Sequence, residues 1–242
     1  MRFLVTGILL VSLWSCSGSK MLQKSLEKYK APIGYLLDSK TTDCLQKDTV
    51  FIRLNNNGLD SITTVSKMKG KVLPFIFFNY TESNMKVGLG QSSLEQSYHD
   101  FFTGSLIAES KRSGCFVADD RTPGSNQYSL EITIDTCKVR SKYQRNSTVI
   151  FLLFAYSMSF QELGFPSETD LVISTRFKKG EKVISEKSYQ IKKTQPFLST
   201  QSANVNKLRA DFTANMVESL SMSTKQCIEE LLNDINKLKQ DN

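Results

Sequence analysis

The residue types most able to bind a metal or form a nucleophile–base pair are few in this 242-residue chain: five cysteines and one histidine, His99. One histidine excludes the multi-histidine metal sites of zinc enzymes. His99 and Asp100 fall on a predicted helix, where adjacent positions point about 100° apart, so we do not expect a catalytic pair. The S-x-x-K spacings at Ser25–Lys28 and Ser83–Lys86 lack the companion motifs of serine–lysine enzymes. These patterns predict no catalytic residue, no metal site, no cofactor and a surface position for His99.

Four cysteines, Cys44, Cys115, Cys137 and Cys227, lie in the part of the chain that is expected to fold. In an exported protein, four cysteines can form two disulfides with three possible connectivities. Cys115 and Cys137 flank successive predicted strands, so they are the pair that we expect first. Buried free thiols are the alternative, because cysteine packs well as a small apolar side chain.

The fifth cysteine, Cys16, follows a segment typical of a signal peptide. Residues 1–15 contain a positive start at Arg2 and an apolar run that is too short to span a bilayer. Leu13-Trp14-Ser15-Cys16 resembles the bacterial lipobox, which implies cleavage before Cys16 and a diacylglycerol on its sulfur. It predicts a lipid-anchored protein of the cell envelope, on the outer membrane and facing the periplasm. A cleaved signal peptide with an incidental Cys16 is the alternative.

The elements that would position a site follow from apolar patterning and turn residues. The predicted divisions are a signal peptide (1–15), a lipidated tether (16–30), a strand and hairpin extension (31–69) and an α/β domain (70–242). In that domain we expect a strand over 72–80 and a helix over 92–113, with capping-box spacing between Ser92 and Glu95. A short strand at 115–118 would then close a right-handed βαβ unit.

The second half of the domain alternates apolar runs with turn-like segments. The predicted strands are 128–139, 148–160, 170–177 and 182–191, joined by loops at 140–147, 161–169 and 178–181. This spacing is typical of an antiparallel meander. A long helix capped by Ser202 or Asn204 follows, with a possible break near Ser221–Ser223. Together the elements predict an α+β fold: a βαβ unit followed by an antiparallel meander, in a mixed sheet with helices packed on one face and a long C-terminal helix.

Basic residues dominate the charge, with 31 lysines and arginines against 24 acidic residues and a net charge of +7. No recognition motif accompanies this excess, so nucleic acid is not an expected partner. Alternate loops of a meander share one end of the sheet, which would gather basic residues from two loops into one contact surface. Its predicted members are Lys138, Arg140, Lys142, Arg145, Arg176, Lys178, Lys179 and Lys182, with Glu162, Glu168 and Asp170 at the opposite end. This surface could attract lipid phosphates or an acidic partner; solvated turn lysines are the alternative.

The order of elements over 70–240 resembles small envelope lipoproteins of the YajG-like and ABC-transport-auxiliary kinds. The resembling parts are Val72-Leu73-Pro74-Phe75 through Asn79-Tyr80-Thr81, the helix end Ser113-Gly114 and the strand Tyr128–Ile134. The resemblance implies a non-catalytic partner in transport or assembly, and Cys16 is its only transferable position.

We therefore predict a membrane-anchored, non-enzymatic accessory or assembly component of an envelope complex, with an envelope protein or a lipid as partner. An envelope enzyme with a site of dispersed residues and a lipid-binding carrier are the alternatives. The end of the C-terminal helix, over 228–238, is expected to pack on the core, with self-association as the other possibility.

Overall fold

The computed structural model of the chain describes residues 28–37, 48–56, 59, 66–73, 77–113, 116–152, 155–197 and 204–240. The strands are β1 (Asp48–Asn56), β2 (Ser66–Leu73), β3 (Phe77–Gly88), β4 (Phe116–Asp119), β5 (Tyr128–Leu152), β6 (Ala155–Lys179) and β7 (Lys182–Gln195). The helices are the short 3-10 helix η1 (Gln91–Ser93), α2 (Tyr98–Ser113) and α3 (Val205–Gln240). The predicted signal peptide, Cys16, Cys44 and Cys115 lie outside the described residues.

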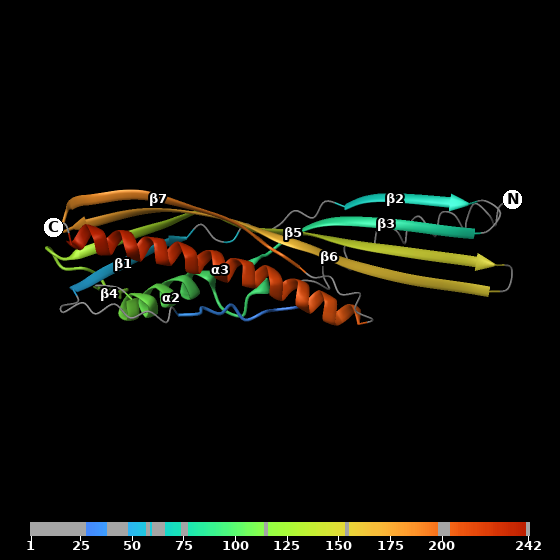
Figure 1. The fold of residues 1–242 in the computed structure, drawn as a ribbon, viewed down its shortest axis with the longest axis horizontal. Coiled ribbons are helices and arrows are strands. Elements are labelled where there is room, and N and C mark those ends of the chain that lie inside the picture. The colour runs from blue at the N-terminus through green and yellow to red at the C-terminus, as the bar shows by residue number, and fades with distance from the viewer. Residues whose placement is uncertain are drawn as a thin grey trace.

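The strands form one mixed, seven-stranded sheet that divides into a body and an arm. β5 is central, because β6 pairs along one of its edges while β1 and then β3 pair along the other. The body consists of β4, β1, β7 and the inner halves of β5 and β6, covered by α2 and α3. The arm consists of 66–73, 77–84, 144–152 and 155–163, and it extends beyond the helices (Figure 1). The sheet and helix arrangement confirms the predicted α+β fold class.

The arm exists because β5 and β6 are each 25 residues long. At about 3.3 Å per residue, each strand is about 80 Å long. The predicted loops at 140–147 and 161–169 are therefore wrong, since both segments belong to these continuous strands. On one face of these segments the polar side chains are buried and hydrogen-bonded, as Tyr143 is to Glu162 and Thr169 is to Ser219, so polarity at these positions did not indicate a turn. Between β6 and β7 a tight turn remains, with Gly180 at a φ of 56°.

The βαβ unit is formed by a different first strand from the predicted one. β4 pairs in parallel with β1, and α2 lies between them in the chain. The predicted strand over 72–80 is wrong, because this stretch includes the end of β2 and the start of β3, which pair antiparallel. The β2–β3 hairpin is thus inserted between β1 and α2. β1 lies inside the sheet between β4 and β5, so the predicted extension over 31–69 contributes a core strand.

Side-chain caps fix where the two α-helices begin. The amide N–H of Asp100 donates to Ser97 Oγ at 3.0 Å, so α2 starts later than the predicted capping box at Ser92 and Glu95. At α3, Asn204 Oδ1 accepts hydrogen bonds from the second and third helical N–H groups, at 3.1 and 3.2 Å. The predicted Asn204 cap is thus confirmed.

α3 continues without a break through its middle. The predicted break near Ser221–Ser223 is wrong, because the helix runs over 36 residues. The hydroxyls of Ser223 and Thr224 each donate to the carbonyl four residues earlier, at 2.8 and 2.9 Å. These polar side chains are therefore satisfied within the helix and remain buried.

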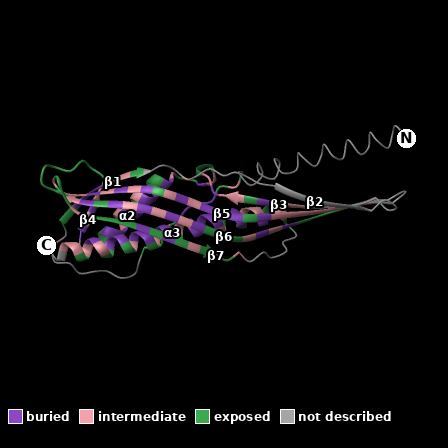
Figure 2. Ribbon diagram, turned by 90° about the horizontal axis from the view of Figure 1, so that it is seen from above, coloured by how far each residue is buried: buried purple, intermediate pink, exposed green. Residues whose placement is uncertain are grey.

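The core lies between the helices and the sheet. Buried residues gather where α2 and α3 cover the body (Figure 2). Phe102, Tyr143 and Phe212 have no exposed surface, and Ile228, Leu231 and Ile235 on the end of α3 are at most 2% exposed. The expected core packing of this last stretch is confirmed. Among the described residues, no helix has an apolar stretch long enough to cross a membrane.

Candidate binding surface

The face of the body sheet that the helices leave open is polar. Along β5, Leu130, Ile132 and Ile134 are buried toward the helices, and the alternate residues Glu131, Thr133 and Asp135 occupy the opposite face. This is the alternation that an antiparallel sheet with one wet face requires. The sequence pattern of this strand already indicated these two faces.

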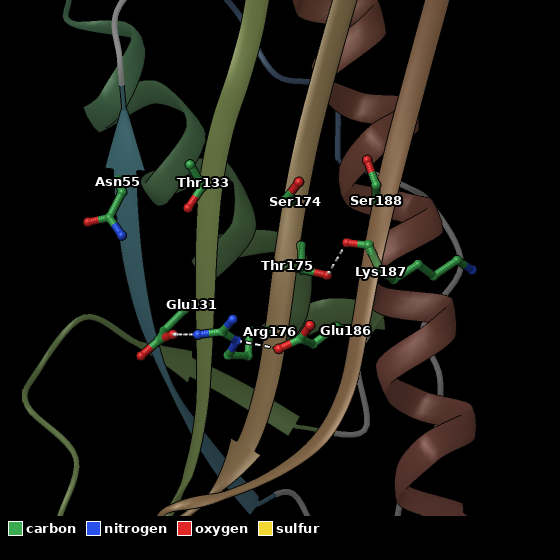
Figure 3. A pocket seen from close by; sticks show the side chains of 9 residues that line it. All are labelled: Asn55, Glu131, Thr133, Ser174, Thr175, Arg176, Glu186, Lys187 and Ser188. Atoms are coloured by element: carbon green, nitrogen blue, oxygen red, sulfur yellow. Dashed lines mark hydrogen bonds and ion pairs between the residues drawn. The ribbon is translucent and has the colours of Figure 1, made fainter.

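Strand register sets charged side chains in one row across four strands of this open face. Arg53 on β1 is in register with Glu131 on β5, Glu131 with Arg176 on β6, and Arg176 with Glu186 on β7. Arg176 Nε lies 2.6 Å from Glu186 Oε1, and its Nη1 lies 3.9 Å from Glu131 Oε2 (Figure 3). Lys178 adds a 2.7 Å contact to Glu131. Positive and negative groups therefore alternate along the row.

A second row, of hydroxyl and amide groups, runs beside the charged one. Its members are in register across the same four strands (Figure 3): Asn55, Thr133, Ser174 and Ser188. Ser174 Oγ donates to Asp135 Oδ2 at 2.6 Å. The row presents both donors and acceptors to a molecule that lies on the sheet.

The two rows line a shallow pocket of about 500 Å³. The charged groups in it are accessible, since Arg176 and Glu186 side chains are 50% and 56% exposed. Each carboxylate of the charged row already accepts from a cation, so neither is a free general base. No cluster of three or more metal-ligating groups occurs among the described residues. This surface is suited to hydrogen bonding and ion pairing with a polar partner.

No family model matches the chain, and no curated protein matches it. Among solved structures, a Xanthomonas campestris protein described under the family model DUF330 aligns with 88% of this chain and 98% of its own, at 8% identity and a TM-score of 0.45. An uncharacterized protein aligns with 86% of this chain and 99% of its own, at 10% identity and a TM-score of 0.40.

The predicted basic surface does not form as one patch. Arg176 is in register with Glu131, whereas Arg140 lies nine residues further along β5, which is about 30 Å of strand. The prediction placed both groups in loops at one end of the sheet, but 138–145 lies in the middle of β5. Continuous strands therefore separate the two groups.

Most of these basic residues face acidic ones. In register, Lys138 is opposite Asp170, Arg140 opposite Glu168 and Arg145 opposite Glu162. The acidic residues predicted for the opposite end of the sheet are thus cross-strand neighbours of the basic ones. Lys142 pairs in register with Lys86, and Lys179 with Lys182 at the β6–β7 turn. Lys179 Nζ also lies 5.0 Å from the centre of the Tyr128 ring.

No pattern in the sequence predicts the buried ion pair that lies where the arm leaves the body, the root of the arm. Arg209 on α3 donates twice to Glu162 on β6, at 2.6 and 2.9 Å, across 47 positions of the chain. Tyr143 OH donates to the same carboxylate at 2.5 Å. Arg145 Nε lies 3.6 Å away and is buried without a hydrogen-bond partner. This cluster attaches the start of α3 to the strands where they leave the body.

Two of the cysteines lie within the described part of the chain. Cys137 and Cys227 are both buried, whereas the expected Cys115–Cys137 disulfide includes Cys115, which lies outside the described residues, so this pairing stays a prediction. Burial raises the pKa of Cys227 to about 12. His99 is about half exposed on α2, which confirms its surface position, but its Nδ1 does lie 3.3 Å from Asp100 Oδ1. The adjacent residues therefore contact each other, contrary to the expectation from helix geometry.

Proposed function

We propose that this chain is a lipid-anchored, periplasm-facing accessory or assembly component of a cell-envelope complex, with no catalytic role of its own. Its partner, an envelope protein, binds the open sheet face. The observation that carries the proposal is the pair of polar rows across β1, β5, β6 and β7, which the helices leave uncovered. Anchoring through Cys16 rests on the lipobox resemblance alone.

The packing of the body favours this proposal over the two alternatives. Large side chains, among them Tyr98, Phe102 and Phe212, fill the space between the helices and the sheet, where a carrier would hold a lipid. An enzyme would need an unpaired base near a nucleophile, and the carboxylates of the charged row are held by Arg176 and Lys178. Both arguments favour a protein that binds a partner over a lipid carrier or an enzyme.

A photo-crosslinking residue tests the surface in the intact envelope. Placed at Ser174, this residue is expected to yield one discrete crosslinked protein. Arg176→Glu should abolish that product, because it reverses the charge at the centre of the charged row. The matched control places the same residue at His99, which is exposed on the helical side. Products that are the same at both positions, or that survive Arg176→Glu, would contradict the proposal.

Anchoring is tested separately by mass spectrometry of the N-terminal peptide. The expected peptide begins at Cys16 and carries the mass of a diacylglycerol with its acyl groups. A mature peptide with an unmodified Cys16 thiol would refute the anchor and leave the test of the sheet face intact.

A further inference from the structure

The strand β6 loses one of its two neighbours where it enters the arm. Over 167–179 it pairs with β5 on one side and with β7 on the other, whereas over 155–163 it pairs only with β5 among the described strands. It therefore forms the edge of the arm opposite β2 (Figure 1). Every second residue of such an edge strand turns its N–H and C=O groups outward, which offers a row of hydrogen-bonding groups to another strand.

The two edges of the body have features that discourage pairing with another strand, and this edge of the arm does not. β7 contains four lysines in 14 residues, and β4 is only four residues long. By contrast, 155–163 contains no lysine, arginine or proline, and its register with 144–152 has no bulge. Its one charged residue, Glu162, is buried and paired with Arg209. The edge is therefore suited to accept a further strand.

The side chains along this edge form an apolar face and a neutral polar face. Phe160 lies two residues from Glu162, which binds Arg209 on α3, so its side chain is on the helix side of the sheet. Met158 shares that face, and Met158 and Phe160 are 45% and 44% exposed. The alternate residues belong to the other face: Ser157, Ser159 and Gln161. A strand that pairs here must match both faces.

A second copy of the same strand meets this requirement. If two copies run antiparallel about a two-fold axis at Ser159, Met158 of each copy lies opposite Phe160 of the other. The neutral polar residues then also lie opposite one another on the other face. An axis at Phe160 would instead place Met158 opposite the buried Glu162. Cross-strand pairs that include an aromatic side chain stabilise a sheet, so the register centred on Ser159 is favoured.

We propose that two copies of the chain pair antiparallel along 155–163 of β6, with the two-fold axis at Ser159, so that their arms form one continuous sheet. The contact is isologous, because the same edge of each copy takes part. It extends over about 30 Å of strand. The pairing is edge to edge and leaves the open face of each body uncovered, so it does not depend on the partner proposed for that face.

Charge substitutions at Ser159 test both the edge and the register. Ser159 is exposed, so circular dichroism should show the same fold in Ser159→Lys and Ser159→Glu as in the parent. Across the proposed axis, the two copies of the substituted residue lie opposite each other. By analytical ultracentrifugation we expect the parent to be a dimer, and each variant to raise its dissociation constant about fivefold, because like charges then meet. Mixing the two variants should restore the dimer, because opposite charges then meet.

The matched control is Gln190→Lys, which adds the same charge at an exposed position of the edge strand β7. It should leave the dissociation constant of the dimer unchanged. Arg176→Glu should also leave it unchanged, since Arg176 lies on the open face of the body (Figure 3). The dimer and the proposed partner of the open face are thus tested by different variants.

Each alternative result overturns the proposal in a different way. A chain that stays monomeric at its highest soluble concentration does not pair through this edge, and the crosslinking test of the open face would still stand. A dimer that neither Ser159 variant weakens is formed by another surface. Two variants that are weakened separately and do not recover on mixing refute the axis at Ser159.

Discussion

The ion pair at the root of the arm makes a quantitative prediction about how the helices hold the strands. The Glu162 side chain is 2% exposed and the Arg209 side chain is 15% exposed, with two hydrogen bonds between them. Arg209→Met keeps most of the side-chain volume and removes the charge. Glu162 then stays buried with Tyr143 OH as its remaining close donor.

The expected cost follows from leaving one charge buried. Removing one partner of a buried pair typically costs about 3–5 kcal/mol. The hydrogen bond from Tyr143 remains, so we expect the lower end, about 3 kcal/mol. For a domain of this size each kcal/mol lowers Tm by about 2–4 °C, which gives a drop of about 6–12 °C.

Urea denaturation followed by circular dichroism measures this cost, and a thermal scan gives the change in Tm. The matched control is Arg176→Met, the same substitution in a pair of similar length whose side chains are about half exposed. Exposed pairs contribute about 0–1 kcal/mol, so this variant should stay close to the parent. Equal losses in the two variants would mean that burial of the Glu162 pair does not decide its energy.

Three further substitutions or treatments have defined outcomes. Gly164→Ala should cost about 1–3 kcal/mol, because its Cβ would overlap Phe197 and lie 2.8 Å from Phe212 Cδ2; an unchanged urea midpoint contradicts this. Burial raises the pKa of Asp234, but hydrogen bonds from β7 outweigh it and leave the pKa lowered. The contribution of Asp234 to the free energy of unfolding should therefore be present above about pH 4 and be lost as pH falls further. Asp234→Asn should accordingly destabilise the protein at pH 6 and not at pH 2. An equal loss of stability at both pH values is the refuting result. The Cys227 thiol, with its pKa raised to about 12 by burial, should resist alkylation at pH 8 until urea is added, as mass spectrometry would detect.

The sequence predicted features that depend on local chemistry. Asn204 caps α3 because its side chain reaches the first free N–H groups, and this signal is contained within four residues. The apolar spacing of α3 and the alternation along the start of β5 likewise need no distant partner. For the same reason the polar open face could be anticipated from Glu131, Thr133 and Asp135.

The arm could not be predicted, because its polar residues look like loops. In 140–147, charged and polar side chains interrupt the apolar run, and 161–169 contains a glycine and a proline. Both segments remain in strands because each has a partner strand that matches it, including the Arg145–Glu162 pair. Register between distant segments also decides which charges meet, which is why the basic residues do not gather at one end of the sheet as predicted. The ion pair of Arg209 with Glu162 is equally a product of packing between distant elements.

The long β5–β6 hairpin makes the reach of this protein adjustable in steps. Adding two residues to each paired strand of the arm would lengthen it by about 7 Å and leave every side chain on its original face. Adding one residue would move every side chain beyond it to the opposite face of the sheet. Residues added beyond Glu162, where α3 makes its contact through Arg209, would leave the body untouched in both cases, since β1 and β7 pair only with the inner halves of β5 and β6. Homologous chains with longer or shorter arms are therefore expected to differ by even numbers of residues per strand, so that the length of one hairpin sets the spacing between its tip and the open face.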